Sequence, residues 1–298
     1  MRILITGISG MLGTDLAEEL TEDHEIIGGD IRNPAAVLNI SFQKLDITDP
    51  GRTYDTVTKI NPDLIIHAAA YTDVDGCEEN FSLAYKTNTM GTRNLALACQ
   101  RFDTALLYIS TDYIFDGQKG QPYKEYDQPK PLSTYAKTKF WGEVHLRELL
   151  SRFYIVRTSW LFGKYGKCFP LSILNLAREN KHLTVVDDQF GSPTYSRHLA
   201  RAIAQLIRRT DPGLYGTYHI TNQGYCSWYE LAKTTLRLAR SKALLSDFHL
   251  DSIKTEALKR KAPRPKFSVL ANLCWKEQGF LPLPPWEEAV EEFLNKLE

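Results

Sequence analysis

The sequence predicts an α/β protein, with a Rossmann-type doubly wound parallel sheet and a smaller α/β substrate-binding lobe. Short apolar runs alternate with segments of helical spacing through the first half of the chain, an order typical of a parallel sheet with helices on both faces. A glycine-rich turn follows the first of these runs. The alternation becomes irregular after residue 158, where we expect the second lobe to begin.

Composition is that of a globular protein without a dominant charge. The chain has 298 residues, 43% of them hydrophobic and 24% charged, enough for one large core and a smaller one. Lys+Arg and Asp+Glu both number 36, so neither nucleic acid nor an anionic membrane is an expected partner. The five cysteines lack the close spacing of a metal clip and are expected to be reduced. With no signal-like or membrane-length apolar run, a cytoplasmic location is expected.

The first predicted strand, residues 2–6, leads into a glycine turn and then a helix. Gly7 permits a tight turn, Gly10 lets the backbone approach a pyrophosphate, and Gly13 lets the helix pack close to the strand. Phosphates would then lie at a helix N-terminus. A plain glycine-rich turn is the alternative, but the strand before it and the helix after it favour a dinucleotide. The expected cofactor contacts here are Gly7, Gly10, Met11 and Leu12.

A second strand, residues 25–28, leads to Asp30, close to where an acid that binds the adenosine ribose is expected. Its carboxylate can accept from both ribose hydroxyls, which favours NADH. Arg32 lies two residues further on, and its guanidinium suits a 2′-phosphate, so NADPH stays open as well. An ordinary turn residue is the alternative interpretation of Asp30.

Two later segments extend this cleft. Asp46 and Ile47 are expected at the adenine, the first accepting from the amino group and the second packing on the ring. The strand at 64–67 ends in three small residues that leave room for a flat ligand, Ala68, Ala69 and Ala70. We expect His67 to be packed and hydrogen bonded rather than catalytic. A helix is predicted from 77 to 99, in which Asn88 either braces neighbouring loops or faces solvent.

Polar residues follow the central strand at 105–109. Thr111, Asp112 and Tyr113 come at its carboxyl end, which is where ligands bind in open α/β sheets. After a loop at 117–131, a helix is predicted to begin near Tyr135.

Tyr135 and Lys139 are four residues apart in that helix, so their side chains share one face. A nearby cation favours phenolate and is expected to lower the pKa of the tyrosine towards neutrality. The same spacing also occurs on ordinary helix surfaces, so the assignment depends on the surrounding cleft.

The second half of the chain is less regular. A strand at 154–157 closes the first domain, and segments near 193–220 are expected to return to its sheet. The predicted dinucleotide-binding domain is therefore 1–158 with about 193–220, and the predicted substrate-binding lobe is 159–192 with 221–298. The basic run at 259–266 contains Arg264, whose planar fork suits a diphosphate, although most such runs are solvated loops. Trp160 is either a stacking surface for the substrate or a core residue.

Seven segments together give the chain a resemblance to the extended short-chain dehydrogenase/reductase family, and within it to the dTDP-4-dehydrorhamnose reductases. They are ITGISGMLG, HAAAYTDVD, STDYIFDG, YAKTK, RTSWLFG, DDQFGSPT and RPKFSVL. Single motifs of this kind are common to many reductases, but the combination of STDYIFDG, DQFGSPT and RPKFS is specific. The resemblance implies hydride transfer from NADPH or NADH to the C4 carbonyl of a 4-keto-6-deoxyhexose carried on dTDP.

The same resemblance implies a role for each polar residue. Tyr135 would give a proton to the new hydroxyl, Lys139 would hold the nicotinamide ribose and lower the tyrosine pKa, and Thr111 would polarise the carbonyl. This agrees with the chemistry, because a hydride that reaches a carbonyl carbon leaves charge on the oxygen, where donors are needed. The expected substrate-binding residues are Thr111, Asp112, Tyr113, Trp160 and Arg264.

Some relatives are described with a magnesium ion held by glutamates near a dimer contact. Here the position after the glycine turn is Asp15, and residues 195–198 contain no carboxylate. We therefore expect no metal, and a homodimer stays open.

Other functions on the same scaffold are a nucleotide-sugar 4,6-dehydratase, a 4-epimerase, another nucleotide-sugar reductase, or a regulatory subunit that binds dinucleotide without turnover. Dehydratase relatives place Asp-Glu after the threonine, whereas this chain has Asp112 and Tyr113 and so lacks the acid that elimination needs. An epimerase keeps NAD bound through its cycle. The regulatory subunit is disfavoured because the three catalytic candidates are all present.

Overall fold

A computed structural model describes residues 1–297 apart from 34–39, 180–181, 210–213, 243–244 and 246–247. Its main feature is a sheet in which seven described strands pair in parallel in the order β11-β6-β5-β4-β1-β2-β3. The strands are β1 (Arg2–Thr6), β2 (Glu25–Asp30), β3 (Ser41–Lys44), β4 (Leu64–His67), β5 (Ala105–Thr111), β6 (Phe153–Thr158) and β11 (Gly216–His219). The doubly wound parallel sheet is confirmed, and its order reverses between β1 and β4.

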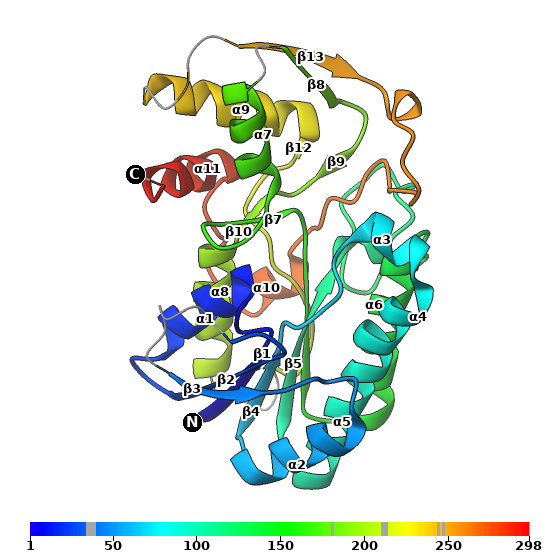
Figure 1. Ribbon diagram of the computed structural model, residues 1–298, viewed down its shortest axis with the longest axis vertical. Helices are drawn as coiled ribbons and strands as arrows, with labels where there is room; N and C mark the ends of the chain where they lie inside the picture. Colours follow the sequence, from blue (N-terminus) through cyan, green and yellow to red (C-terminus); the bar gives the residue numbers. More distant parts are fainter. Residues whose placement is uncertain (34–39, 180–181, 210–213, 243–244, 246–247, 298) are drawn as a thin grey trace.

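Helices cover both faces of this sheet (Figure 1). One face carries α1 (Met11–Leu20), α8 (Ser196–Arg208) and α10 (Leu273–Glu277), and the other carries α2 (Pro50–Ile60), α5 (Thr92–Phe102) and α6 (Thr134–Leu149). Because successive side chains of a strand point to opposite faces, Ile3 and Ile5 enter the first core while Leu4 enters the second. Strands that are apolar on both faces in this way belong inside a parallel sheet.

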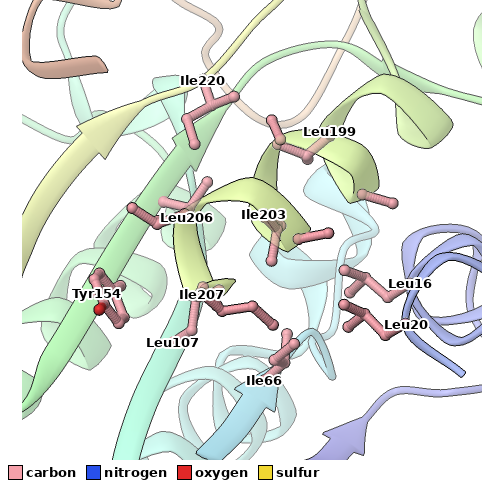
Figure 2. Packing of buried hydrophobic residues seen from close by; sticks show 14 of the residues in the cluster. Leu16, Leu20, Ile66, Leu107, Tyr154, Leu199, Ile203, Leu206, Ile207 and Ile220 are labelled. Atoms are coloured by element: carbon pink, nitrogen blue, oxygen red, sulfur yellow. The ribbon is translucent and has the colours of Figure 1, made fainter. Parts of the chain in front are cut away.

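The apolar spacing of α8 shows how the second half of the chain returns to the first. Leu199, Ile203, Leu206 and Ile207 recur at helical spacing on one face and are buried. Figure 2 shows these side chains between Leu16 and Leu20 of α1 and the sheet residues Ile66, Leu107 and Tyr154. Each fully buried leucine or isoleucine contributes about 1.5–3 kcal/mol, so this contact is a major part of the core.

The segment predicted as one helix from 77 to 99 is divided, and that prediction is wrong. It contains α3 (Val74–Glu79), α4 (Phe81–Ala84), a π-helical segment (Tyr85–Gly91) and α5. The Asn80 side chain accepts a hydrogen bond from the Leu83 N–H, so it ends one helix and caps the next. The π-helical turn then shifts which side chains face the sheet.

The second lobe has its own core. Its helices are α7 (Phe169–Glu179), α9 (Trp228–Ser241) and α11 (Trp286–Asn295), and its short strands pair as β7 (Leu161–Phe162) with β10 (Thr194–Tyr195), β9 (Phe190–Gly191) with β12 (Cys226–Ser227), and β8 (His182–Val186) with β13 (His249–Ile253). Two 3-10 segments, Asp112–Ile114 and Thr255–Ala257, complete the described elements. None of the described helices combines the length and apolarity needed to cross a membrane.

Two packing facts bear on the predicted domain boundaries. β11 pairs with β6 at the edge of the main sheet, so residues 216–219 lie in the first layer. α10 and the residues after it also pack there, because Trp275, Phe280 and Leu283 are buried in the core beneath α8. Residues 273–283, predicted in the lobe of 221–298, thus pack in the first core, and the domain bounds stay a prediction. The five cysteines are free thiols, as expected.

Candidate active site

A cavity of about 1040 Å³ lies at the carboxyl ends of the central strands, where β1 and β4 diverge. This is the topological switch point at which open α/β sheets bind ligands. The cavity brings together residues from the glycine turn, from the ends of β2, β4 and β5, from α6 and from the second lobe. Its lining includes every sequence-predicted site residue except Arg264, namely Gly7, Gly10, Met11, Leu12, Asp30, Arg32, Asp46, Ile47, Ala68, Ala69, Ala70, Thr111, Asp112, Tyr113, Tyr135, Lys139 and Trp160.

The glycine turn is shaped for close backbone approach. Gly7 has φ of +75°, and a Cβ there would lie 2.6 Å from the Ala69 amide nitrogen. A Cβ on Gly13 would lie 2.2 Å from the Gly7 carbonyl oxygen, so α1 packs on the turn only with glycine at this position. Gly10 begins α1 without a side-chain cap, which leaves the first-turn N–H groups available to an anionic ligand. These features fit the pyrophosphate of a dinucleotide.

Asp30 ends β2 and lines the cavity beside this turn. Its carboxylate accepts from the backbone N–H groups of Ser9 and Arg32, both at 3.1 Å. The two bonds fix the carboxylate while leaving lone pairs for a ribose. The Arg32 side chain is exposed at the same end of the cavity. The Asp30 carboxylate has the chemistry to accept from a ribose diol, and the Arg32 guanidinium has the chemistry to pair with a 2′-phosphate.

Asp46 and Ile47, the residues predicted to lie at the adenine, are each held by a hydrogen bond to a neighbouring residue. Asp46 accepts from the Thr48 N–H at 2.9 Å and from its hydroxyl at 2.8 Å. Ile47 is buried, and its carbonyl accepts from the Asn94 amide at 2.9 Å. Both residues line the cavity, with Ile47 offering an apolar surface and Asp46 an acceptor.

His67 and Asn88 are structural supports of the loop after β4. The His67 ring is buried and hydrogen bonds with the hydroxyls of Thr6 at 2.7 Å and Thr92 at 3.0 Å, and burial holds its pKa well below the ordinary value. The prediction of a packed histidine is confirmed. The Asn88 side chain exchanges two hydrogen bonds with the Tyr71 backbone, at 2.8 and 3.1 Å, and donates to Thr138 of α6 at 3.2 Å. Of the two alternatives for Asn88, bracing is the one observed.

Thr111, Tyr135 and Lys139 come from adjoining elements. Thr111 is the last residue of β5, and the Ser133 hydroxyl caps α6 by accepting from the Ala136 N–H at 3.3 Å, which places Tyr135 in the first turn and Lys139 in the second. The Lys139 ammonium donates to the Ile109 carbonyl at 2.7 Å. All three side chains line the one cavity.

The expected lowering of the Tyr135 pKa is wrong for this structure. Burial raises the pKa of the phenol, and a hydrogen bond with Thr111 opposes the rise. Burial also lowers the pKa of Lys139 to about 7, with Glu143 opposing. Because each group is removed from water, each is driven towards its neutral form. The phenol is thus held as a protonated donor, which is the form that an acid needs.

Asp112 joins this group through hydroxyls that the sequence interpretation missed. Its carboxylate accepts from Thr111 at 3.2 Å, from Ser159 at 2.9 Å and from Ser268. Burial raises the Asp112 pKa to about 6, and the three hydroxyls oppose the rise. Ser268 lies in the segment RPKFSVL, which carries part of the family resemblance, but the sequence does not show that this hydroxyl pairs with Asp112. The carboxylate orients the Thr111 hydroxyl at the end of β5.

Trp160 packs against the second core and also lines the cavity, so its stacking on a substrate stays a prediction. Its ring stacks on Trp228 with centroids 3.6 Å apart and planes 9° apart, and both rings pack against the second core. Both also line the cavity. Trp160 has φ of +46°, a region uncommon for a non-glycine residue. A Cβ on Gly191 would lie 2.4 Å from its ring, so a close backbone neighbour fixes this orientation. Trp228, in the first turn of α9, was missed from the sequence.

Arg264, the candidate for binding the substrate diphosphate, is not among the residues that line the cavity. Its guanidinium donates to both oxygens of Asp75, at 2.9 and 2.7 Å, and to the Ala262 carbonyl at 2.8 Å. Hydrogen bonds from Arg264 lower the pKa of Asp75 to about 2. Arg264 also interacts with the Tyr113 side chain, and Tyr113 does line the cavity. The arginine is therefore one side chain removed from the cleft.

Asp15, in the region that the resemblance links to magnesium, is engaged by protein groups. It is buried in α1 and accepts from the Ser196 hydroxyl of α8. Its neighbour Glu18 accepts from the Tyr165 hydroxyl and lies 3.5 Å from an Arg197 guanidinium nitrogen. Burial raises the pKa of Asp15 to about 6, while Ser196 opposes the rise. This carboxylate links two helices of the first core.

Asp15→Asn is expected to remove a pH-dependent part of the stability. An acid whose pKa is raised stabilises the fold below its ordinary pKa, and that contribution is lost as pH rises through about 6. The free energy of unfolding of the variant relative to the parent should therefore increase by roughly 1–3 kcal/mol from about pH 4.5 to about pH 7.5. Urea unfolding at both pH values measures this. Asp55→Asn, on an exposed face of α2, is the control, and an equal difference for Asp15→Asn at both pH values would contradict the assignment.

Comparisons with known proteins agree along the full chain. A model of the family described as the RmlD substrate binding domain matches residues 1–298. A dTDP-4-dehydrorhamnose reductase from Aggregatibacter actinomycetemcomitans is 38% identical over 295 residues, covering 97% of each chain. A dTDP-4-keto-6-deoxy-D-glucose reductase from Streptomyces niveus is 34% identical over 292 residues, covering 98% of this chain and 96% of its own.

A solved structure gives the same result for the fold. The crystal structure of dTDP-4-dehydrorhamnose reductase from Bacillus anthracis, in complex with NADP, superposes with a TM-score of 0.90 at 40% identity and covers 99% of both chains. The family model and these relatives extend over both lobes and the cleft between the glycine turn and Tyr135. The chain therefore belongs to the dTDP-4-dehydrorhamnose reductase family.

Proposed function

We propose that this protein reduces the C4 keto group of dTDP-4-dehydro-6-deoxy-L-mannose to give dTDP-L-rhamnose, with NADPH or NADH as the reductant. The observation that carries the proposal is that Thr111, Tyr135 and Lys139 line the same cavity as the glycine turn. A reductase needs this combination because the proton donors must meet the ketone beside the bound nicotinamide. Family membership supports the substrate class, since the relatives act on dTDP-linked ketosugars by name.

Each residue has a task that its surroundings support. When bound, the reduced nicotinamide supplies the hydride. Thr111 lies at the end of β5, and its hydroxyl donates to Asp112 in the ligand-free site. To polarise the carbonyl, this hydroxyl would turn its one proton from Asp112 to the carbonyl oxygen as charge develops there. Tyr135 keeps its proton because burial raises its pKa, and gives that proton to the oxygen. Lys139 is held at the floor of the cavity by the Ile109 carbonyl, where it would contact the nicotinamide ribose.

The substrate is proposed to enter beside the second lobe. The stacked pair of Trp160 and Trp228 offers an aromatic surface to the nucleotide base or sugar. Tyr113 lies with its ring perpendicular to that of Tyr135, the centroids 6.3 Å apart, and so connects the reacting centre to Arg264. Both guanidinium nitrogens of Arg264 that donate to Asp75 would have to be shared with, or given up to, the phosphate oxygens if Arg264 binds the diphosphate.

The proposed division of labour follows the two cores. Residues 1–158 with 193–220 form the dinucleotide-binding part, and the helices and short strands of the second core bear on the sugar nucleotide. The segment 273–283 belongs with the first part by its packing. The cleft between Gly7 and Trp160 then lies where the two parts meet.

An absorbance assay tests the proposal. Purified protein is mixed with dTDP-4-dehydrorhamnose and either NADPH or NADH, and oxidation of the nicotinamide is followed at about 340 nm. We expect turnover with at least one cofactor, and proton nuclear magnetic resonance should identify dTDP-L-rhamnose. The NADP complex of the relative from Bacillus anthracis and the exposed Arg32 favour NADPH. Absence of oxidation with both cofactors would overturn the proposal.

A second nucleotide-sugar reductase activity is the main alternative. The relative from Streptomyces niveus is named for reduction of dTDP-4-keto-6-deoxy-D-glucose, which differs in stereochemistry and carries the same C4 ketone. Running that ketone in the same assay, at matched concentration, separates the two, because the true substrate should have the larger kcat/KM. Tightly bound NAD in the purified protein would instead favour an epimerase.

A further inference from the structure

A histidine- and carboxylate-containing cluster lies on the small sheet of β8 and β13, at the end of the second lobe far from the central sheet (Figure 1). The two strands run parallel, and His182 is the register partner of His249. Paired residues of adjacent strands project to the same face, as do residues two apart in one strand. His182, His249 and Asp251 are therefore brought together by the register itself.

The possible ligand atoms of the cluster lie close enough together for one ion to reach all three. The His182 Nε2 atom lies 2.6 Å from Asp251 Oδ2, and the His249 Nε2 atom lies 3.1 Å from Asp251 Oδ1. One ligand atom from each residue lies within 4.8 Å of the other two. Ligands at the ~2.0–2.2 Å bond lengths of zinc sites are separated by roughly 3–3.6 Å, so small rotations of exposed side chains suffice.

We propose that His182, His249 and Asp251 bind a divalent transition metal ion, with Zn²⁺ as the representative ion. Imidazole nitrogen with one carboxylate suits Zn²⁺, Co²⁺, Ni²⁺ or Cu²⁺, whereas Mg²⁺ and Ca²⁺ prefer oxygen ligands throughout. The side chains are 63%, 69% and 48% exposed in the order named, so solvent completes the coordination. This site is separate from the Asp15 region and from the cofactor cleft.

The ion would link β8 to β13 at the start of their pairing, whereas side-chain hydrogen bonds already link the two segments at the other end. After β13, the Lys254 ammonium bonds to Asp187 at 2.8 Å, and Thr255 donates to Asp188 through its N–H at 2.9 Å and its hydroxyl at 2.6 Å. At the start of the β8–β13 pair, His182 of β8 contacts Asp251 of β13 and lies opposite His249. A bound metal would therefore join β8 to β13 at both ends, and β13 leads into the loop that carries Arg264.

Calorimetric titration of the full chain, with any histidine tag removed, tests the site. Zn²⁺ alone is titrated at about pH 7.5, where an ordinary imidazole is neutral. We expect one ion per chain with a dissociation constant in the micromolar range, and at least a tenfold weakening in His249→Asn and in Asp251→Asn. His145→Asn, on α6 and outside the cluster, is the matched control and should bind as the parent does.

Two further measurements separate coordination from a simple hydrogen-bonded His–Asp–His cluster. Co²⁺ bound to two imidazoles and a carboxylate should give visible absorption bands in the parent that are lost in His249→Asn, and Mg²⁺ in excess should not compete. Zn²⁺ should also raise the melting temperature of the parent more than that of Asp251→Asn. Exposed substitutions of this kind leave the fold intact, so failure to bind is interpretable. Zinc binding that is unchanged in both variants, or absent from the parent up to about 1 mM, would overturn the proposal.

Discussion

Tyr135→Phe is expected to reduce kcat/KM for ketone reduction by about 10²–10⁴-fold, the usual contribution of a positioned general acid. The substitution removes one hydroxyl from a half-buried ring that lies beside Thr111 and Tyr113. Because burial raises the pKa of this phenol, the parent carries the proton at neutral pH and the variant has none to give. The dinucleotide contacts at the glycine turn are untouched, so cofactor affinity should change little.

Steady-state rates and cofactor titration by nicotinamide fluorescence measure the two effects separately. Tyr126→Phe is the matched control, because its ring is 65% exposed and lies outside the cavity. A Tyr135→Phe variant that reacts within a few fold of the parent would exclude the tyrosine as the acid. Loss of cofactor binding in the same variant would instead show that the hydroxyl supports the nicotinamide pocket.

Local patterns were sufficient to predict the framework of the site. Strand, glycine turn and helix follow one another within a few residues, and the carboxyl ends of parallel strands meet at one edge whatever the loops between them do. For this reason the sequence predicts Gly7, Asp30, Thr111 and Tyr135 around one cleft, and all four line the cavity. The i to i+4 spacing likewise predicted that Tyr135 and Lys139 share a face.

Contacts between distant segments were not predictable in the same way. The Asp75 carboxylate accepts hydrogen bonds from the guanidinium of Arg264, which lies 189 residues away in the sequence. The Ser268 hydroxyl donates to Asp112, which lies 156 residues away. Neither pairing leaves a periodic signal, because each depends on how the second lobe closes over the first. The predicted lowering of the Tyr135 pKa was wrong for the same reason. Lys139 could be seen four residues away in the sequence, whereas the burial that raises the pKa of the phenol could not.

The buried face of α6 is a further case, because it is polar. Tyr135, Lys139 and Glu143 recur every four residues, and Lys139 and Glu143 are almost fully buried. A pattern of charged residues at helical spacing ordinarily predicts a solvated face. Here the stripe faces β5 and β6, whose Ser110 and Arg157 supply the partners. The proposed catalytic roles of Tyr135 and Lys139 account for the exception, since both side chains then have to reach the cavity at the carboxyl ends of the strands.

Glu143→Ala is expected to lower the free energy of unfolding by about 3–5 kcal/mol, as removal of one member of a buried ion pair does. The Glu143 carboxylate accepts from Arg157 at 3.0 and 2.7 Å and from the Ser110 hydroxyl at 2.6 Å. Side chains of both charged residues are nearly inaccessible, at 0% and 2%. Without the carboxylate, the Arg157 guanidinium would be left as an unpaired charge beneath the site. Urea unfolding of parent and variant at about pH 7.5 measures the loss.

Arg147→Ala supplies the control, because Arg147 donates to the same carboxylate at 3.1 Å but is 37% exposed. Its loss should be about 1 kcal/mol or less, the usual worth of an exposed ion pair. Near-equal losses for the two variants would mean that burial does not determine the strength of this network. Glu143 also opposes the lowering of the Lys139 pKa, so its removal should drive Lys139 further towards the neutral amine. Cofactor affinity is measured in the same variant. If it falls by more than the loss of folded protein explains, the Glu143 carboxylate supports both the fold and the positive charge of Lys139.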